Sequence, residues 1–208
     1  NDPAVVPADI ASIQEPLGNA VYCVLIEDVA GKTVAVFGDG PAGLFAAEVA
    51  RASGAAKVML VGIEEIRLGI GRELGARVID ARLIDPVLQI KQMTGGLGAD
   101  VVLEMSGAET AIKQAILSIK PGGRICAFGI TPEKTVKIDW NKLVFSGIRI
   151  YGIHGRQIFD SWIKVRNFLK ARSLNLKPII THAFPLEKFD EAFKLALSRK
   201  CGKILLHP

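Results

Sequence analysis

The sequence has little from which to build a metal cluster or a disulfide framework. Its three cysteines, Cys23, Cys126 and Cys201, are far apart in the 208 residues and lie among apolar neighbours. Cysteines in such settings are typical of reduced core positions in a cytoplasmic protein. The three histidines are equally scattered, and no Cys/His group has the spacing of metal ligands, so we expect no complete zinc site within this sequence.

Long apolar runs and clustered charge are also absent. No segment approaches the roughly 20 apolar residues that span a membrane, and the first residues lack the regions of a signal peptide. Lysine and arginine number 26 against 21 acidic residues, and no basic run is interleaved with aromatics. We therefore expect neither a membrane nor a nucleic acid as partner. The chain begins with Asn1 rather than methionine, which indicates a processed chain or a piece of a longer protein.

The most informative feature that is present is a glycine-rich turn between two apolar segments. Residues 33–37 predict a buried strand, and an apolar helical pattern begins at Leu44. Between them stands a G-x-G-x-x-G motif made by Gly38, Gly40 and Gly43. In a dinucleotide-binding fold the first glycine permits a tight turn, the second lets the backbone approach a pyrophosphate, and the third lets helix and strand pack closely. The helix N-terminus then favours a doubly charged anion.

Strands and helices alternate around this turn. Strands are predicted at 33–37, 57–61, 77–79, 100–104, 124–128 and 148–153, and helices at 42–53, 64–74, 86–93, 108–119 and 159–171. Near-continuous apolar strands in this alternation predict an α/β fold, a doubly wound parallel sheet (Rossmann fold) covered on both faces. A helix over about 18–31 is expected before the sheet, and residues 121–123 (Pro-Gly-Gly) are expected to form a turn.

The pattern changes after Pro178, where a short apolar piece, a helix and a last strand follow. This tail fits poorly as another layer of the same sheet. We therefore predict three parts: an entry segment with its helix (1–30), a Rossmann dinucleotide-binding domain (31–175), and a tail that belongs to an incomplete second domain (176–208).

The position that should bind the adenosine ribose is unusual. An acidic residue is expected roughly 20 residues beyond the third glycine, where this sequence has Gly62. Glu64 or Glu65 could supply the carboxylate and favour NAD, or the space at Gly62 could admit the extra phosphate of NADP beside Arg67. All three charged residues could equally be ordinary residues of a helix start. The balance favours NAD and leaves NADP open.

A second departure lies inside the glycine turn itself. Asp39 is one of its variable residues, and a carboxylate beside a pyrophosphate would repel it. The alternative is that the side chain points away, toward water or a helix N-terminus, and the sequence leaves both interpretations open.

Small residues follow the later strands, where a parallel sheet binds its ligands. Ser106 and Gly107 follow the fourth predicted strand, residues 128–130 the fifth, and residues 153–155 the sixth. Such residues leave room for a flat ring, and their backbone groups can bond a carboxamide. They could also be plain turn residues.

These motifs and several longer runs resemble the cofactor-domain part of the zinc-dependent medium-chain dehydrogenase/reductase family. The runs that carry the resemblance include the glycine turn and Gln14–Val21, Leu103–Ala108, Tyr151–Arg156 and Pro178–His182. The resemblance covers essentially the whole chain and is closest to threonine dehydrogenases.

The resemblance implies hydride transfer from a small-molecule hydroxyl substrate to NAD, with NADP possible. Zinc assists in such enzymes, and its ligands are not in this chain. The expected parent reaction is oxidation of L-threonine to 2-amino-3-oxobutanoate. A sorbitol- or butanediol-type dehydrogenase and a non-catalytic NAD(H)-binding module are the alternatives. The resemblance further implies a cytoplasmic homodimer or homotetramer, pairing through an edge strand near 148–153, and no turnover by this chain alone.

The resemblance also assigns individual residues. Glu15 matches the acidic residue beside the catalytic zinc, although it could be an ordinary solvated carboxylate. Ala42 matches a backbone contact in the phosphate turn, whereas Gly62 and Arg67 match positions near the adenosine. The nicotinamide-side contacts match Phe128, Gly129, Ile130, Ile153 and His154. His154 could equally be a plain loop histidine.

Overall fold

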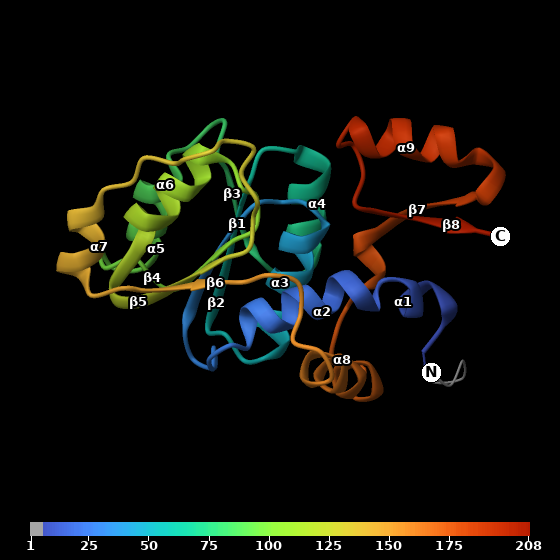
Figure 1. Cartoon of the computed structure of the whole chain (residues 1–208), viewed down its shortest axis with the longest axis horizontal. Coiled ribbons are helices and arrows are strands. Elements are labelled where there is room, and N and C mark those ends of the chain that lie inside the picture. Colours follow the sequence, from blue (N-terminus) through green and yellow to red (C-terminus); the bar gives the residue numbers. More distant parts are fainter. Residues whose placement is uncertain (1–5) are drawn as a thin grey trace.

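The structure, a computed structural model, describes residues 6–208 and centres on a six-stranded parallel sheet (Figure 1). The strands are β1 (Thr33–Phe37), β2 (Lys57–Gly62), β3 (Arg77–Asp80), β4 (Ala99–Glu104), β5 (Ile119–Ala127) and β6 (Arg149–Gly152). Their spatial order is β3-β2-β1-β4-β5-β6. The order reverses between β1 and β4, which confirms the predicted doubly wound sheet and locates its switch point.

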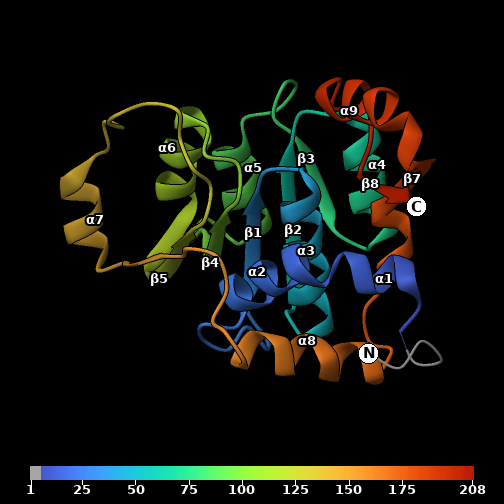
Figure 2. The same cartoon turned by 45° about the vertical axis from the view of Figure 1, so that its right-hand side comes forward.

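Helices cover both faces of the sheet (Figure 2). One face is packed by α2 (Gln14–Val24), α3 (Pro41–Ala52), α4 (Glu65–Glu73) and α8 (Asp160–Lys170), and the other by α5 (Pro86–Met93), α6 (Glu109–Ser118) and α7 (Trp140–Ser146). Alternate residues of β1 point to the two faces of the sheet. Val34 and Val36 belong to the hydrophobic cluster on the first face, and Ala35 and Phe37 to the cluster on the second. All four are fully buried, which explains why this strand is apolar without interruption.

Three details differ from the predicted elements. The first long helix begins at Gln14 and ends at Val24, not 18–31, and a short helix, α1 (Ala8–Ser12), precedes it. β5 begins at Ile119, so residues 121–123 lie within a strand whose register with β4 shifts between Ala99 and Val101. Helix α7 was not predicted.

The capping residues of α7 are nevertheless visible in the sequence. The Asp139 side chain accepts a hydrogen bond from the Lys142 amide at 2.9 Å, and Gly147 ends the helix at φ 57°. An aspartate before a helix and a glycine in the left-handed region after it are the usual signals for these two ends.

The tail forms a small sheet of its own. It comprises η1 (Lys177–Ile179), β7 (Ile180–Pro185), η2 (Leu186–Lys188), α9 (Phe189–Leu197) and β8 (Lys203–His207). β7 and β8 pair in parallel and do not join the main sheet. Figure 1 shows the tail beside α4, at the opposite end of the molecule from α7. Within residues 6–208, no helix combines the length and apolar character that a bilayer crossing needs.

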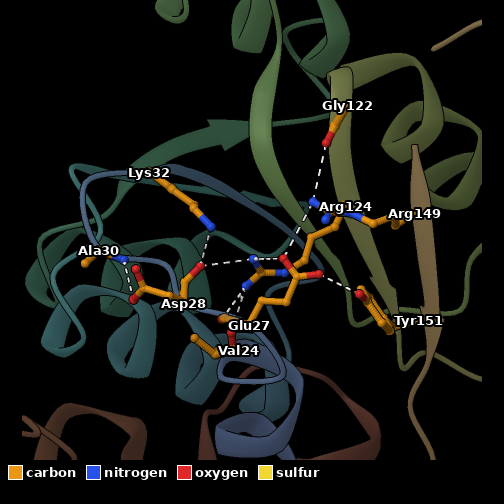
Figure 3. A network of polar contacts seen from close by, with 9 residues as sticks. All are labelled: Val24, Glu27, Asp28, Ala30, Lys32, Gly122, Arg124, Arg149 and Tyr151. Atoms are coloured by element: carbon orange, nitrogen blue, oxygen red, sulfur yellow. Dashed lines mark hydrogen bonds and ion pairs between the residues drawn. The ribbon is translucent and has the colours of Figure 1, made fainter. Parts of the chain in front are cut away.

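A buried arginine ties the chain after α2 to the sheet (Figure 3). Arg124, on β5, is 1% exposed, and its guanidinium donates to the carbonyl oxygens of Val24 (3.1 Å), Glu27 (2.7 Å) and Asp28 (3.0 Å). The Val24 carbonyl lies at the C-terminus of α2, where carbonyl oxygens lack donors within the helix and where the helix dipole is stabilised by a positive charge. The Tyr151 hydroxyl donates to the Glu27 carboxylate at 2.5 Å. That bond and the nearby Arg124 lower the pKa of Glu27.

Candidate functional site

A cavity of about 510 Å³ opens at the carboxyl ends of β1, β2 and β4. It lies at the switch point of the sheet, where open α/β sheets bind their ligands. Its lining comes from the glycine turn, the β2–α4 turn and the β4–α6 turn with the start of α6. Three residues from elsewhere complete it: Ala81, Pro132 and Arg199.

The glycines of the turn have distinct geometries. Gly38 has φ +117°, a conformation that side-chain-bearing residues rarely adopt. A β-carbon on Gly43 would overlap the carbonyl group of Gly38, with its carbon only 2.9 Å away. Nothing lies within 4 Å of a β-carbon on Gly40, which lines the cavity. The turn is therefore tight at Gly43 and open at Gly40, where the protein backbone could contact a ligand.

The N-terminus of α3 begins at this open side and has no side-chain cap. Gly40 is the N-cap residue, and no side chain bonds the first turn. The first helical bond runs from the Leu44 amide to the Gly40 carbonyl at 3.0 Å. The preceding amides of Ala42 and Gly43 have no acceptor among the described residues. Uncapped amides at a helix start fit an anion such as a diphosphate.

The Asp39 side chain points away from these amides. Its Oδ2 accepts hydrogen bonds from the amides of Ile63 and Glu64, both at 2.7 Å, and the residue is 6% exposed. Glu64 is the N-cap residue of α4, so the carboxylate bonds the segment that leads into α4 and not the start of α3. The conflict expected from a carboxylate inside the phosphate turn is thereby removed.

A second buried carboxylate shapes the β4–α6 turn. Glu104 is 3% exposed and accepts hydrogen bonds from the amides of Ser106 and Gly107, both at 3.0 Å. A β-carbon on Gly129 would lie 2.5 Å from Oε2 of Glu104, and one on Gly107 would lie 2.5 Å from the carbonyl carbon of Ile130. The chain segments after β4 and β5 therefore approach backbone to backbone, which only glycine permits here.

The residues predicted for the phosphate turn and for the adenosine are only partly found in this cavity. Gly38, Gly40, Gly62 and Arg67 line it, and so does Glu64, whereas Ala42 and Gly43 do not. The Arg67 Nε also donates to the Cys201 carbonyl at 2.7 Å, so this arginine holds the tail against α4.

Glu65, the other acidic candidate for the ribose, is engaged elsewhere. It pairs with Arg72 at 2.7 Å, and the hydrogen bond from that arginine lowers the pKa of the Glu65 carboxyl.

The residues predicted on the nicotinamide side lie near the cavity's rim or away from it. Gly129 and Ile130 pack against Gly107, which lines the cavity, but neither lines it itself. Ile153 is buried, and its amide donates to the Ala127 carbonyl at 2.9 Å in continuation of β6. The remaining two, Phe128 and His154, are half-buried and exposed.

Glu15 lies in a different cavity. It stands in the first turn of α2, and its carboxylate pairs with Arg156. The Arg156 guanidinium lies over the Trp162 ring, 5.3 Å from its centroid. These residues line a second hollow of about 510 Å³ together with Phe159. Residues 6–208 contain no group of three His, Cys, Asp or Glu side chains that could hold a metal ion.

The cavity also contains residues that the sequence analysis missed. Thr110 and Gln114 project from α6, and their place was readable because the first turns of a helix after the switch-point strand face the crevice. Arg199 reaches the cavity from the segment between α9 and β8, with φ +62°. No sequence signal linked this tail residue to the glycine turn.

Comparisons with known proteins agree with this arrangement. The profile of a family described as zinc-binding dehydrogenase matches residues 41–171. The chain is 45% identical, over its full length, to an L-threonine 3-dehydrogenase of Bacillus licheniformis, and 41% identical over 98% of its length to one of Pyrococcus furiosus. It spans 60% and 59% of those two proteins.

Solved structures show the same fold. The crystal structure of 2R,3R-butanediol dehydrogenase from Bacillus subtilis superposes with a TM-score of 0.91 at 30% identity, over 99% of this chain and 59% of that one. An alcohol dehydrogenase from Thermotoga maritima gives 0.84 at 28% identity, over 100% and 58%. With its switch-point cavity and uncapped glycine turn, the chain belongs to the zinc-binding dehydrogenase family, of whose curated relatives it spans about three fifths.

Proposed function

We propose that this chain is the cofactor-binding part of a zinc-assisted, NAD(P)-dependent alcohol dehydrogenase. The observation that carries the proposal is the open side of the turn at Gly40, which lines the switch-point cavity. The amides of Ala42 and Gly43, which follow it at the start of α3, have no acceptor among the described residues. We assign the diphosphate of the cofactor to these amides, because a helix start without a cap stabilises an anion. The bound nicotinamide would accept the hydride.

The remaining contacts extend from this anchor. Residues of the β2–α4 turn, among them Gly62 and Arg67, are proposed to hold the adenosine end. The segments after β5 and β6, which include residues 128–130 and 153–154, are proposed to lie on the nicotinamide side, since both follow the carboxyl ends of strands beside the switch point.

Titration calorimetry with NADH and NADPH tests the binding. The unaltered chain should bind NADH, and Gly40→Val should abolish binding while the thermal unfolding curve stays close to that of the parent. Gly69→Val is the matched control, because a β-carbon on Gly69 of α4 also meets nothing within 4 Å and the residue does not line the cavity. Equal binding by both variants would contradict the proposed diphosphate position.

The parent reaction proposed is the oxidation of L-threonine to 2-amino-3-oxobutanoate. Support comes from relatives named L-threonine 3-dehydrogenase at 41–45% identity. The structural match to 2R,3R-butanediol dehydrogenase favours a sorbitol- or butanediol-type enzyme as the second candidate. A panel of L-threonine, butanediol and sorbitol on the full-length protein, with NADH formation as the readout, distinguishes them.

Glu15 is proposed to lie beside the catalytic zinc of the whole enzyme, whose ligands would come from sequence outside this chain. Its ion pair with Arg156 would orient the carboxylate toward the hollow that both residues line. We therefore expect the isolated chain to bind the nucleotide without turnover. NADH production from threonine by the isolated chain with added zinc would contradict this, and an inactive full-length protein would favour a non-catalytic NAD(H)-binding module.

A homodimer or homotetramer is proposed through the edge of the main sheet. β6 is the edge strand, and Ile150 on it is 48% exposed. The neighbouring α7 exposes Trp140 (68%), Val144 (59%) and Phe145 (87%). An open apolar edge favours pairing with a second strand. Ile150→Lys should shift the sedimentation coefficient toward that of the monomer, and an unchanged value would count against this interface.

The three-part organisation and the location in the cell are further proposals. The separate β7–β8 sheet supports assigning 176–208, with the entry segment 1–30, to a junction with the catalytic domain, apart from the 31–175 cofactor domain. All three cysteines are buried and free, which favours the cytoplasm. Limited proteolysis, with cleavage expected near residues 30 and 175, would test the division.

A further inference from the structure

Two departures of this sequence from the usual dinucleotide site meet at one point in space. Gly62 stands where an acidic residue normally binds the adenosine ribose, and Asp39 stands inside the phosphate turn. A β-carbon on Gly62 would lie 2.5 Å from Cγ of Asp39 and would overlap its carboxylate. The Asp39 side chain therefore fills the volume that a side chain at position 62 would occupy.

The strand register explains why these two residues meet. β1 and β2 are parallel neighbours with Phe37 opposite Val61. Just beyond this pair the Gly38 amide donates to the Val61 carbonyl at 2.9 Å, and the Asp39 side chain then crosses to the amides of Ile63 and Glu64. A carboxylate that leaves from the end of β1 thus reaches the end of β2.

The carboxylate retains capacity for a ligand. Oδ2 accepts both backbone amides, whereas Oδ1 makes no hydrogen bond to any described residue. Asp39 lines the cavity together with Gly62, Ile63 and Glu64. A carboxylate offers about four lone-pair sites, so Oδ1 remains able to accept a hydrogen bond from a sugar hydroxyl.

We propose that Asp39 supplies the ribose-binding carboxylate in place of the missing acid at position 62, and thereby makes the site selective for NAD over NADP. The inference rests on the proposed function, because it names the residue that reads the ribose in the same cavity. A 2′-hydroxyl donates to Oδ1, whereas the 2′-phosphate of NADP brings negative charge against a carboxylate that two amides hold in place.

Positive charge on the same cavity is the opposing influence. Arg67 and Arg199 both line it, and a phosphate would attract them. Arg67 already donates its Nε to the Cys201 carbonyl at 2.7 Å, which restricts its movement. Asp39, at 6% exposure, is less screened by water than a surface group, so its repulsion should decide the preference.

Calorimetric affinities of the chain for NADH and NADPH test the proposal. The unaltered chain should bind NADH at least about tenfold more tightly than NADPH, since a hydrogen bond to a charged group is worth this much. Asp39→Asn keeps an oxygen for the amides of Ile63 and Glu64 but removes the charge, and should reduce the NADH preference about tenfold. Asp39→Ala with Gly62→Asp moves the carboxylate to the usual position and should restore the preference.

The outcomes separate this inference from the proposed function. If Asp39→Asn weakens both nucleotides by the same factor, Asp39 only supports the turn and the inference fails, while dinucleotide binding stands. Equal or tighter binding of NADPH by the unaltered chain also overturns it. Binding of neither nucleotide by the unaltered chain overturns both. Recovery of NADH preference in the double variant, with Asp39→Ala alone lacking it, supports the relocation directly.

Discussion

Charged side chains at the two ends of β1, β4 and β5 have different kinds of partner. At the amino end, Arg124 on β5 meets three carbonyl oxygens and the Glu27 carboxylate, and Asp100 on β4 meets Lys120 and Thr33. At the carboxyl end, the carboxylates of Asp39 and Glu104 accept from backbone amides, with one serine hydroxyl, and pair with no cation of residues 6–208.

This difference suggests that the amino end of the sheet supports stability and that the carboxyl end binds the ligand. At the amino end each charge has an opposite charge as its partner, so we expect these groups to act mainly on stability. A carboxylate held by amides stays in place yet keeps its negative charge and spare lone pairs. The carboxyl end also has the cavity, so its charges can act on a ligand. Substitutions at the amino end should therefore change stability, and those at the carboxyl end should change nucleotide binding.

The largest expected effect lies at the amino end. Arg124→Met should lower the free energy of unfolding by about 3–5 kcal/mol, because three carbonyl oxygens lose their buried donor and the Glu27 carboxylate loses its partner. Denaturant titration measures the loss. Arg149→Met is the matched control, since Arg149 is 3.6 Å from the same Glu27 but half exposed, and should cost less than about 1 kcal/mol. NADH affinity of the folded Arg124 variant should remain unchanged.

The next largest effect is expected in the glycine turn. If every substitution there changed stability and NADH binding together, the distinction between the two ends of the sheet would fail. Gly43→Ala forces a β-carbon into the Gly38 carbonyl and should cost about 3 kcal/mol together with NADH binding. Gly40→Ala meets open space and should cost about 0.5 kcal/mol or less. A similar stability loss in both variants, measured by thermal unfolding, would contradict the geometry described for this turn.

A smaller, pH-dependent effect is expected from Asp100. Burial raises the pKa of this carboxyl, but hydrogen bonds from Lys120 and Thr33 outweigh it and hold the pKa at about 2, against an ordinary 3.8. A lowered pKa in the folded state stabilises the protein above pH 3.8, and this contribution disappears as the pH falls toward 2. Asp100→Asn should therefore cost about 1–2 kcal/mol at neutral pH.

The same variant tests the sign of this dependence. The stability difference between the parent and Asp100→Asn should shrink below about pH 4, where the parent loses the contribution that the variant never had. A double-mutant cycle with Thr33→Val should show coupling, because the Thr33 hydroxyl donates to Asp100 at 2.6 Å. A pH-independent difference would refute the assigned charge state.

The smallest effect is expected from Glu65, at the carboxyl end but outside the cavity. Its pair with Arg72 is more than half exposed on both sides, so Glu65→Ala should leave the thermal unfolding midpoint unchanged. It should also leave NADH affinity unchanged, which distinguishes it from Asp39→Asn. Weaker NADH binding in the Glu65 variant would indicate that Glu65, at the start of α4, contacts the ribose, and would argue against that role for Asp39.

Much of the fold was predictable because its signals are local. The predicted strand at 33–37 and the predicted helix at 42–53 coincide with β1 and α3 to within a residue. Asp85 caps α5, as an aspartate before Pro86 suggests. The missed helix α7 buries Leu143 but leaves Trp140, Val144 and Phe145 exposed, so its apolar residues do not mark one buried face, although its caps were visible.

The candidate site was predictable only in part. The glycine turn and the strand ends could be located because a dinucleotide-binding fold places them at one edge of the sheet. The contribution of Arg199 could not, because it depends on how the tail packs against α4 through Arg67 and Cys201. Contacts between segments so distant in the chain depend on tertiary packing, and they cannot be predicted from the periodicity or the composition of the sequence.

By itself, the sequence determined the strand and helix alternation, the turn at Gly38–Gly43 and the absence of an acidic residue at position 62, since each depends on residues within one element. Only the tertiary structure decided where the Asp39 carboxylate lies. The parallel register of β1 and β2 brings the end of one strand beside the end of the other, and a short side chain can then cross between them. The carboxylate that is unexpected in the glycine turn therefore occupies the place of the carboxylate that is missing at position 62.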